Sequence, residues 1–149
     1  MELYKRNVAL EWYQYGLEKK DDFFMRFMMH WVAFNWLYNS EHEITERNKI
    51  RQYYFHNRSR FESYDAFSSP AIDVFMAGPV YSDVDIKNVE KDYEGLKKKD
   101  YRCLLMTLYR VRCNLFHGSK SLLNERDQQL VRASADILEG FLKALLKAN

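Results

Sequence analysis

Glycine and proline are scarce in this chain of 149 residues, which contains five glycines and two prolines. Both prolines, Pro70 and Pro79, fall in one short stretch, so the long segments on either side of it are free to be helical. No window of about 18 residues is apolar and free of charge, and the N-terminal residues lack the apolar core of a signal peptide. We therefore expect an all-α cytoplasmic protein with no membrane segment.

Cysteine is rare too, and neither sign of charge dominates. Cys103 and Cys113 lie on one predicted helix, about 15 Å apart along its axis, which is too far for a disulfide between them. The 23 basic and 21 acidic residues give a net charge of +2, so any basic site must be local. The histidines and cysteines show no metal-ligand spacing, and we expect neither a metal site nor a cofactor.

What the chain has in quantity is apolar and aromatic side chains, at 47% and 16% of its residues. Such a composition excludes a disordered chain. A chain of this length buries roughly 70% of its unfolded surface, which suits one domain with its own core. We expect a single domain over residues 1–149.

Apolar spacing predicts long helices over residues 2–19, 22–39, 43–61, 100–118 and 123–146, a weaker helix over 88–97 and one helical turn at 72–76. Asp21 and Asp22 suit the start of the second helix, and Asp100 suits the start of the helix that Gly118 ends. The remainder of 62–87 reads as a long connection. Together these elements predict an antiparallel helical bundle with about four main helices and several short ones.

The same spacing predicts which faces are buried. In the first helix Val8, Trp12 and Tyr15 recur as an inward stripe, and in the last helix Leu130, Ile137, Phe141 and Leu145 do so. Arg126, Arg132 and Lys143 are expected to face outward from that last helix.

The most polar segment of the chain ends an otherwise apolar helix. Arg110, Arg112, Asn114 and His117 fall within its last two turns, and Gly118 and Lys120 follow. Guanidinium binds phosphate in a bidentate manner, and imidazole transfers protons near neutral pH. The negative end of the helix dipole also stabilises a cation at His117. The segment therefore has the chemistry that binding or cleaving a phosphodiester requires.

This order, an arginine followed by four residues and then a histidine, resembles the Rx4-6H signature of the HEPN superfamily. A second stretch, from Phe34 and Asn35 to Leu37 and Tyr38, resembles the F-N-x-L-Y sequence of many stand-alone HEPN proteins. The resemblance implies an α-helical bundle that forms a homodimer, in which the motifs of two protomers meet in a shared cleft. Active members are metal-independent endoribonucleases, often toxins paired with a nucleotidyltransferase antitoxin, and inactive members bind RNA or nucleotides.

Under this resemblance Arg112 stabilises the phosphorane, His117 transfers protons and Asn114 orients the substrate or His117. Arg110 and Lys120 become phosphate-binding residues, although Arg110 also satisfies the looser spacing of the motif. Cys113 departs from the polar residue that often follows the motif arginine, and this departure leaves a non-catalytic RNA- or nucleotide-binding module as the alternative.

Purely structural roles stay open for the same residues. Arg112 would then pair with an acid such as Glu125 or Asp127, and His117 would cap the helix. Asn35 would be a buried carboxamide bonded to backbone or to a neighbouring helix.

Overall fold

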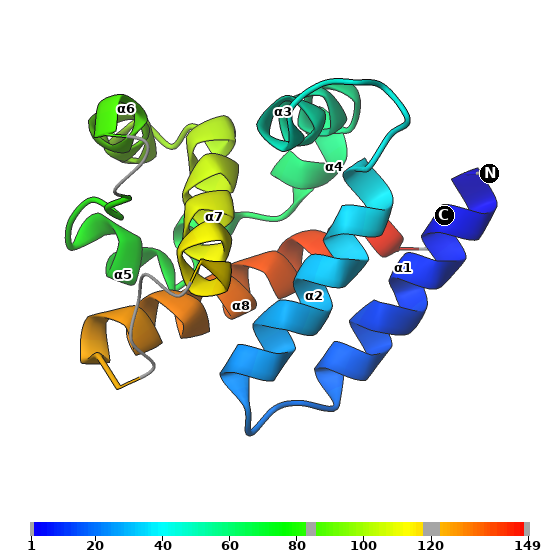
Figure 1. Cartoon of the computed structure of the whole chain (residues 1–149), viewed down its shortest axis with the longest axis horizontal. Helices are drawn as coiled ribbons and strands as arrows, with labels where there is room; N and C mark the ends of the chain where they lie inside the picture. The colour runs from blue at the N-terminus through cyan, green and yellow to red at the C-terminus, as the bar shows by residue number, and fades with distance from the viewer. Residues whose placement is uncertain (1, 83–85, 118–122, 148–149) are drawn as a thin grey trace.

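A computed structural model describes residues 2–82, 86–117 and 123–147, and within them the chain is all-helical (Figure 1). The four longest helices are α1 (Glu2–Leu17), α2 (Phe23–Tyr38), α7 (Tyr101–Phe116) and α8 (Glu125–Leu146). The shorter elements are α3 (Glu46–His56), α4 (Arg58–Ser63), the 3-10 turn η1 (Ala66–Ser68), α5 (Ile72–Met76) and α6 (Ile86–Lys97). The predicted all-α bundle with about four main helices is confirmed. No helix among the described residues is long and apolar enough to cross a membrane.

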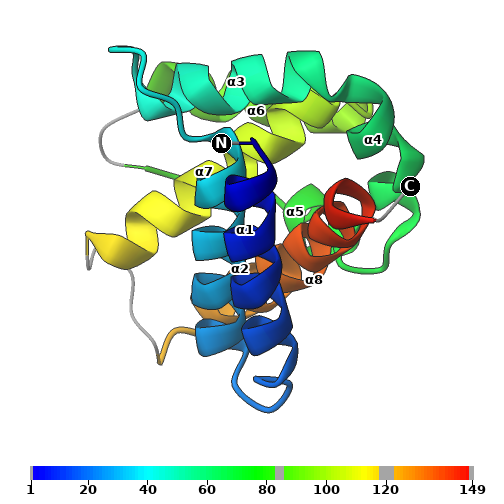
Figure 2. The same cartoon turned by 90° about the vertical axis from the view of Figure 1, so that its right-hand side faces the viewer.

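The helices are arranged around α8, which crosses behind α2 and α7 in Figure 1. α1 and α2 form an antiparallel pair on one side, and Figure 2 shows this pair edge-on beside α8. α6 packs on the far side of α7, while α3 lies across the ends of α2 and α7. The C-terminal end of α7, which carries the polar segment, therefore emerges beside α2.

Side-chain caps explain where several helices begin. The Asp22 carboxylate accepts a hydrogen bond from the Met25 backbone N–H at 3.1 Å, and that of Asp100 accepts one from the Arg102 backbone N–H at 2.8 Å. Such bonds satisfy donors that the first helical turn leaves unpaired. Asp22 is thus the capping residue of α2, and the predicted cap at Asp100 is confirmed.

The core is rich in aromatic side chains. Phe141 of α8 packs edge-on against Phe61, Tyr64 and Tyr101, and the inward stripe predicted for α8 is buried throughout. T-shaped pairs of this kind add to the free energy gained from burying the rings. The aromatic cluster ties α4, α7 and α8 together.

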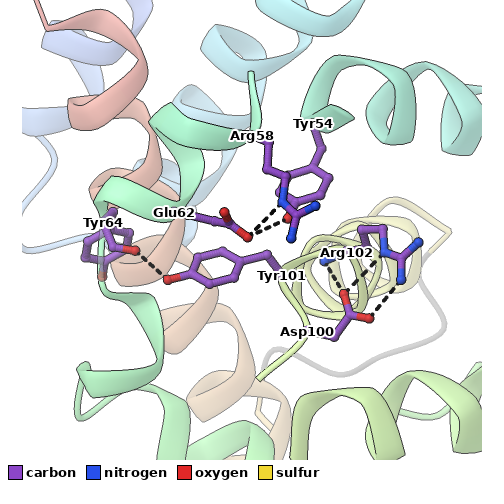
Figure 3. Close-up of polar contacts among 7 residues, drawn as sticks. All are labelled: Tyr54, Arg58, Glu62, Tyr64, Asp100, Tyr101 and Arg102. Atoms are coloured by element: carbon purple, nitrogen blue, oxygen red, sulfur yellow. Dashed lines mark hydrogen bonds and ion pairs between the residues drawn. The ribbon is translucent and has the colours of Figure 1, made fainter. Parts of the chain in front are cut away.

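The single helix predicted over 43–61 is wrong, because Asn57 divides it into α3 and α4. The Asn57 backbone leaves the helical conformation, and its side chain donates a hydrogen bond to the Tyr53 carbonyl at 2.9 Å. Across the break, the Tyr54 hydroxyl of α3 and Arg58 Nε of α4 both donate to Glu62 Oε1 at 3.1 Å (Figure 3). The bond from the Asn57 side chain to the Tyr53 carbonyl competes with regular backbone bonding, and α3 ends at this point.

The inward stripe predicted for α1 is observed only in part, since Val8 and Trp12 are half-buried and Trp12 packs against the core. The buried residues of α1 are Ala9 and Gly16, whereas Tyr15 is 45% exposed. A Cβ added at Gly16 would lie 2.6 Å from His30 Nδ1, so the close approach of α1 to α2 requires a small residue there. Bulky side chains consequently lie at the edges of this interface.

Arg126 does not face outward as predicted. Its guanidinium donates to the Val74 carbonyl within α5 at 2.6 Å and to the Gly78 carbonyl just after α5 at 3.1 Å. The predicted helix start at Leu123 is two residues early, because Asn124 caps α8 at Glu125.

A pair of arginines closes the far end of α8. Arg6 of α1 donates to the carbonyls of Leu145 and Lys147 at 3.2 and 2.6 Å, and Arg60 of α4 also donates to Leu145 at 3.2 Å. These carbonyls have no partner within α8 itself, because a helix leaves its last acceptors free. We call Arg6, Arg60 and the two carbonyls the terminal clasp.

His30 is fully buried where α1, α2 and α8 meet. Its Nε2 lies 3.0 Å from Glu139 Oε1, its ring stacks on Tyr13, and Arg26 binds both Glu139 and Asp136. His30 and Arg26 hold the pKa of the Glu139 carboxyl below its usual value. Folding therefore favours the ionised form of this carboxyl.

Glu139→Gln is expected to destabilise the protein most at neutral pH. A carboxyl with a lowered folded pKa contributes stability above its unfolded pKa and loses that contribution as the pH falls through the folded value. The gap in unfolding free energy between wild type and variant should therefore narrow as the pH falls below about 4.5. Urea denaturation of both proteins from pH 3 to 7 measures this difference in unfolding free energy. A difference independent of pH would contradict the lowered pKa of Glu139.

Candidate nucleic-acid interface

The buried stripe of α7 decides where its polar side chains point. Leu104, Leu108 and Val111 are buried in the core, and Leu115 is half-buried. At about 100° per residue, Arg112 and Asn114 lie on nearly opposite sides of α7. The C-terminal half of the helix therefore presents different chemistry toward α2 and toward α6.

Arg112 faces α2 and is held in a fixed position. Its Nη1 donates to Glu46 Oε1 at 2.8 Å, and its guanidinium carbon lies 5.7 Å from the ring centre of Trp31 and 4.8 Å from that of Phe116. Guanidinium groups bind favourably over aromatic faces. The Arg112 side chain is 24% exposed, so this cation is positioned by the fold and still meets solvent.

The second motif lies beside the first. Asn35 Nδ2 donates to the Tyr38 hydroxyl at 3.0 Å, and the Tyr38 ring packs against Trp31, over which Arg112 lies. Burial raises the pKa of Tyr38, and the nearby Glu46 carboxylate raises it further. The two stretches on which the HEPN resemblance rests thus meet at the α2–α7 contact. The buried carboxamide predicted for Asn35, bonded to backbone or to a neighbouring helix, is wrong, because Asn35 is half-buried and its partner is a side-chain hydroxyl on its own helix.

Tyr109 and Cys113 complete the α2-facing side of α7. The Tyr109 ring centre lies 6.3 Å from that of Trp31. Burial, together with a hydrogen bond to the Cys113 thiol, raises the pKa of Tyr109 to about 12. Its hydroxyl therefore stays protonated at neutral pH and does not serve as a base.

Asn114 and Arg110 face the other way. Asn114 Nδ2 donates to the Tyr81 carbonyl at 2.8 Å and the residue is buried, so the structure does not bring it beside Arg112. Arg110 Nη2 donates to Asp92 Oδ2 at 2.6 Å, and both residues are 4% exposed. Of the two arginines that fit the motif spacing, Arg112 is the more exposed, with 24% of its side chain accessible against 4% for Arg110.

His117 caps α7 at the surface. Its backbone N–H bonds the Cys113 carbonyl at 3.0 Å, and the residue is exposed. In the part of the chain that the structure describes, no hydrogen bond joins its imidazole to Arg112. Gly118 and Lys120 lie outside the described residues.

Glu46 is the partner that sequence reasoning missed. An acid beside Arg112 is expected under the structural alternative, but the expected residues, Glu125 and Asp127, lie on α8 rather than α3. Glu46 stands 66 positions before Arg112 in the chain, and no local pattern links them. The same holds for Trp31, which looks like any other residue of the apolar stripe of α2.

Cys103 and Cys113 are both free thiols, as predicted. Burial raises the pKa of Cys103 to about 11, with smaller contributions from Asp100 and Asp92. Residues 2–82, 86–117 and 123–147 contain no group of three or more His, Cys, Asp or Glu side chains that could hold a metal ion.

Comparison of the chain with models of known families, with curated proteins and with solved structures found no match. The resemblance to the HEPN superfamily consequently rests on the two motifs.

Proposed function

We propose that this protein is a metal-independent endoribonuclease of HEPN type, with its site at the Arg112–His117 end of α7. The observation that carries the proposal is the arrangement of one cation and one imidazole. Arg112 is fixed at the surface by Glu46 and Trp31, and the exposed His117 follows five residues later. An oriented guanidinium and a solvent-accessible histidine are the groups that phosphodiester cleavage by a 2′-hydroxyl requires.

In this mechanism the Arg112 guanidinium binds the scissile phosphate and stabilises the charge that develops on it. His117 transfers the proton, either from the 2′-hydroxyl or to the leaving 5′-oxygen. The two tasks need two proton-transfer groups, and one protomer offers one exposed histidine in this segment. A homodimer with two-fold symmetry supplies the second, because each protomer brings its own Arg112 and His117 to a shared cleft. Phe116, 51% exposed beside Arg112, provides apolar surface for that contact.

The wider setting follows from the same resemblance. We place the protein in the cytoplasm, where its two free thiols remain reduced. A nucleotidyltransferase antitoxin is the expected protein partner, in a toxin-antitoxin or defence role. Light scattering is expected to give the mass of a dimer, and a monomer at high concentration would argue against a composite cleft.

The decisive experiment is cleavage of end-labelled single-stranded RNA in excess EDTA. We expect His117→Ala and Arg112→Ala each to lower the rate by at least about a hundredfold, because each removes a group that acts in the transition state. Arg102→Ala and His56→Ala are the matched controls, since Arg102 is an exposed arginine at the other end of α7 and His56 an exposed histidine on α3. Equal activity in wild type and all four variants would disprove the proposal.

A second candidate is a non-catalytic module that binds RNA through Arg112. Two contacts and one residue favour it: Glu46 already bonds Arg112, Asn114 is bonded to the Tyr81 carbonyl, and Cys113 stands where a polar residue often follows the motif arginine. Glu46→Gln removes the acid that competes with phosphate for Arg112, and should tighten RNA binding by about two- to fivefold. Binding that weakens with salt and yields no cleavage products would favour this candidate over the enzyme.

A further inference from the structure

A surface pocket of about 670 Å³ lies at the junction of α1, the end of α2 and the segment that follows α2. Its lining includes Lys5 from α1, Asn35, Trp36 and Asn39 from the end of α2, and Ser40 beyond it. Pockets of this size are typical of small-ligand sites. Arg112, Asn114 and His117 do not line it, although Asn35 of the second motif does, so its role is a separate question.

The pocket offers an aromatic ring that is held in place. Tyr4 packs against Trp36 with ring centres 6.0 Å apart and planes at 81°. A ring in this perpendicular arrangement covers at most one face of the indole. Trp36 is half-buried, so it is anchored in the fold while part of the ring lines the pocket. Rigid, partly open aromatic rings are the platforms on which unpaired nucleobases stack.

Carboxamides surround this ring. Asn35 and Asn39 both line the pocket, and Asn39 is fixed from two directions, because Lys5 donates to its carbonyl at 2.5 Å and Lys49 to its Oδ1 at 3.0 Å. Amide groups read the edges of bases by hydrogen bonding. An aromatic platform flanked by amides suits a base better than an aliphatic ligand.

The charges around the pocket indicate how such a ligand would lie. Glu2, Glu41, Lys5 and His42 line the pocket, and Lys49, which is not part of the lining, also donates to Asn39. The two carboxylates disfavour a phosphate inside the pocket, so a neutral base would occupy it and the phosphates would lie near the two ammonium groups at Asn39. The pocket is partly open to solvent, so a polynucleotide strand bound there can continue out of it.

We infer that this pocket binds one unpaired nucleotide of a single-stranded RNA, with the base stacked on Trp36 and its edge facing Asn35 and Asn39. The inference goes beyond the proposed cleavage, since it concerns a different surface and holds whether or not the RNA is cut. Residues 40–42, which line the pocket, lie just before Glu46, the residue that bonds Arg112. One RNA strand can therefore reach both the pocket and Arg112.

The test is fluorescence anisotropy with a labelled eight-nucleotide single-stranded RNA, carried out in a His117→Ala background so that cleavage does not interfere. Trp36→Leu keeps apolar packing against Tyr4 but removes the stacking surface, and should raise the Kd about five- to hundredfold. Trp12→Leu is the matched control, because Trp12 lies on α1 outside the pocket, and should change the Kd less than twofold. Asn39→Ala, at an exposed position, should raise the Kd by about fivefold through its lost amide.

Three results with the single strand would overturn the inference: no binding by the parent protein, equal effects of Trp36→Leu and Trp12→Leu, or an unchanged Kd for both Trp36→Leu and Asn39→Ala. A duplex of the same sequence separates base stacking from general attraction to phosphate. Its affinity should not respond to Trp36→Leu, because paired bases cannot enter the pocket, and an equal loss for duplex and single strand would also overturn it. These binding measurements do not require RNA cleavage, because all of them use the His117→Ala background. Failure of the pocket proposal can therefore be told apart from failure of the proposed endoribonuclease activity.

Discussion

Replacing Arg110 by methionine is expected to lower the free energy of unfolding by about 3–5 kcal/mol. Arg110 and Asp92 are both 4% exposed and are joined at 2.6 Å between α7 and α6. The variant leaves the Asp92 charge buried without its guanidinium partner, and it is this uncompensated charge that costs the free energy. Urea denaturation at pH 7 measures the change.

Two further variants separate this explanation from others. Asp92→Leu combined with Arg110→Met removes both charges, and should recover most of the lost stability because apolar pairs often replace buried ion pairs without cost. Arg102→Met breaks an exposed pair on the same helix and should cost less than about 1 kcal/mol. A loss below about 1 kcal/mol for Arg110→Met would contradict the buried pair and reopen a phosphate-binding role for Arg110.

Phe141→Ala is expected to cost about 3–5 kcal/mol, the usual range for a large aromatic residue removed from a core. Phe141 is fully buried, and its ring meets those of Phe61, Tyr64 and Tyr101 at 5.3–6.0 Å. Removing it leaves a cavity where α4, α7 and α8 meet. The loss should appear as a lower urea midpoint with the slope of the transition retained.

Phe55→Ala is the control for this prediction. Phe55 is 75% exposed on α3, so its removal should change stability by less than about 0.5 kcal/mol. Similar losses for the two variants would mean that the stability of the protein does not depend on the aromatic cluster at Phe141.

The elements that sequence analysis placed well are those decided by nearby residues. Asp22 and Asp100 cap the helices that follow them, and the spacing of Leu130, Ile137 and Phe141 gave the buried face of α8. The break at Asn57 was missed because no glycine or proline interrupts the pattern there. Asparagine ends α3 through a side-chain bond, and its identity alone does not distinguish that role from a place on a helix surface.

Contacts between distant segments were harder to foresee. The apolar pattern of α1 favoured its bulky residues, but the closest helix contact is at Gly16, where lack of a side chain allows His30 to approach. Sequence analysis singled out Arg112 and His117 as a candidate pair. It did not provide Glu46 and Trp31, which hold Arg112, because only the tertiary fold brings α2, α3 and α7 together.

The terminal clasp bears on the order in which the chain folds. Arg6 lies in the first helix, and its acceptors, Leu145 and Lys147, are separated from it by about 140 residues. During synthesis α1 and α2 can pair as soon as both have left the ribosome, because their contacts are local in sequence. The clasp closes only after Lys147 has been made, so α8 completes the domain, and until then the α8-facing side of the α1–α2 pair stays uncovered.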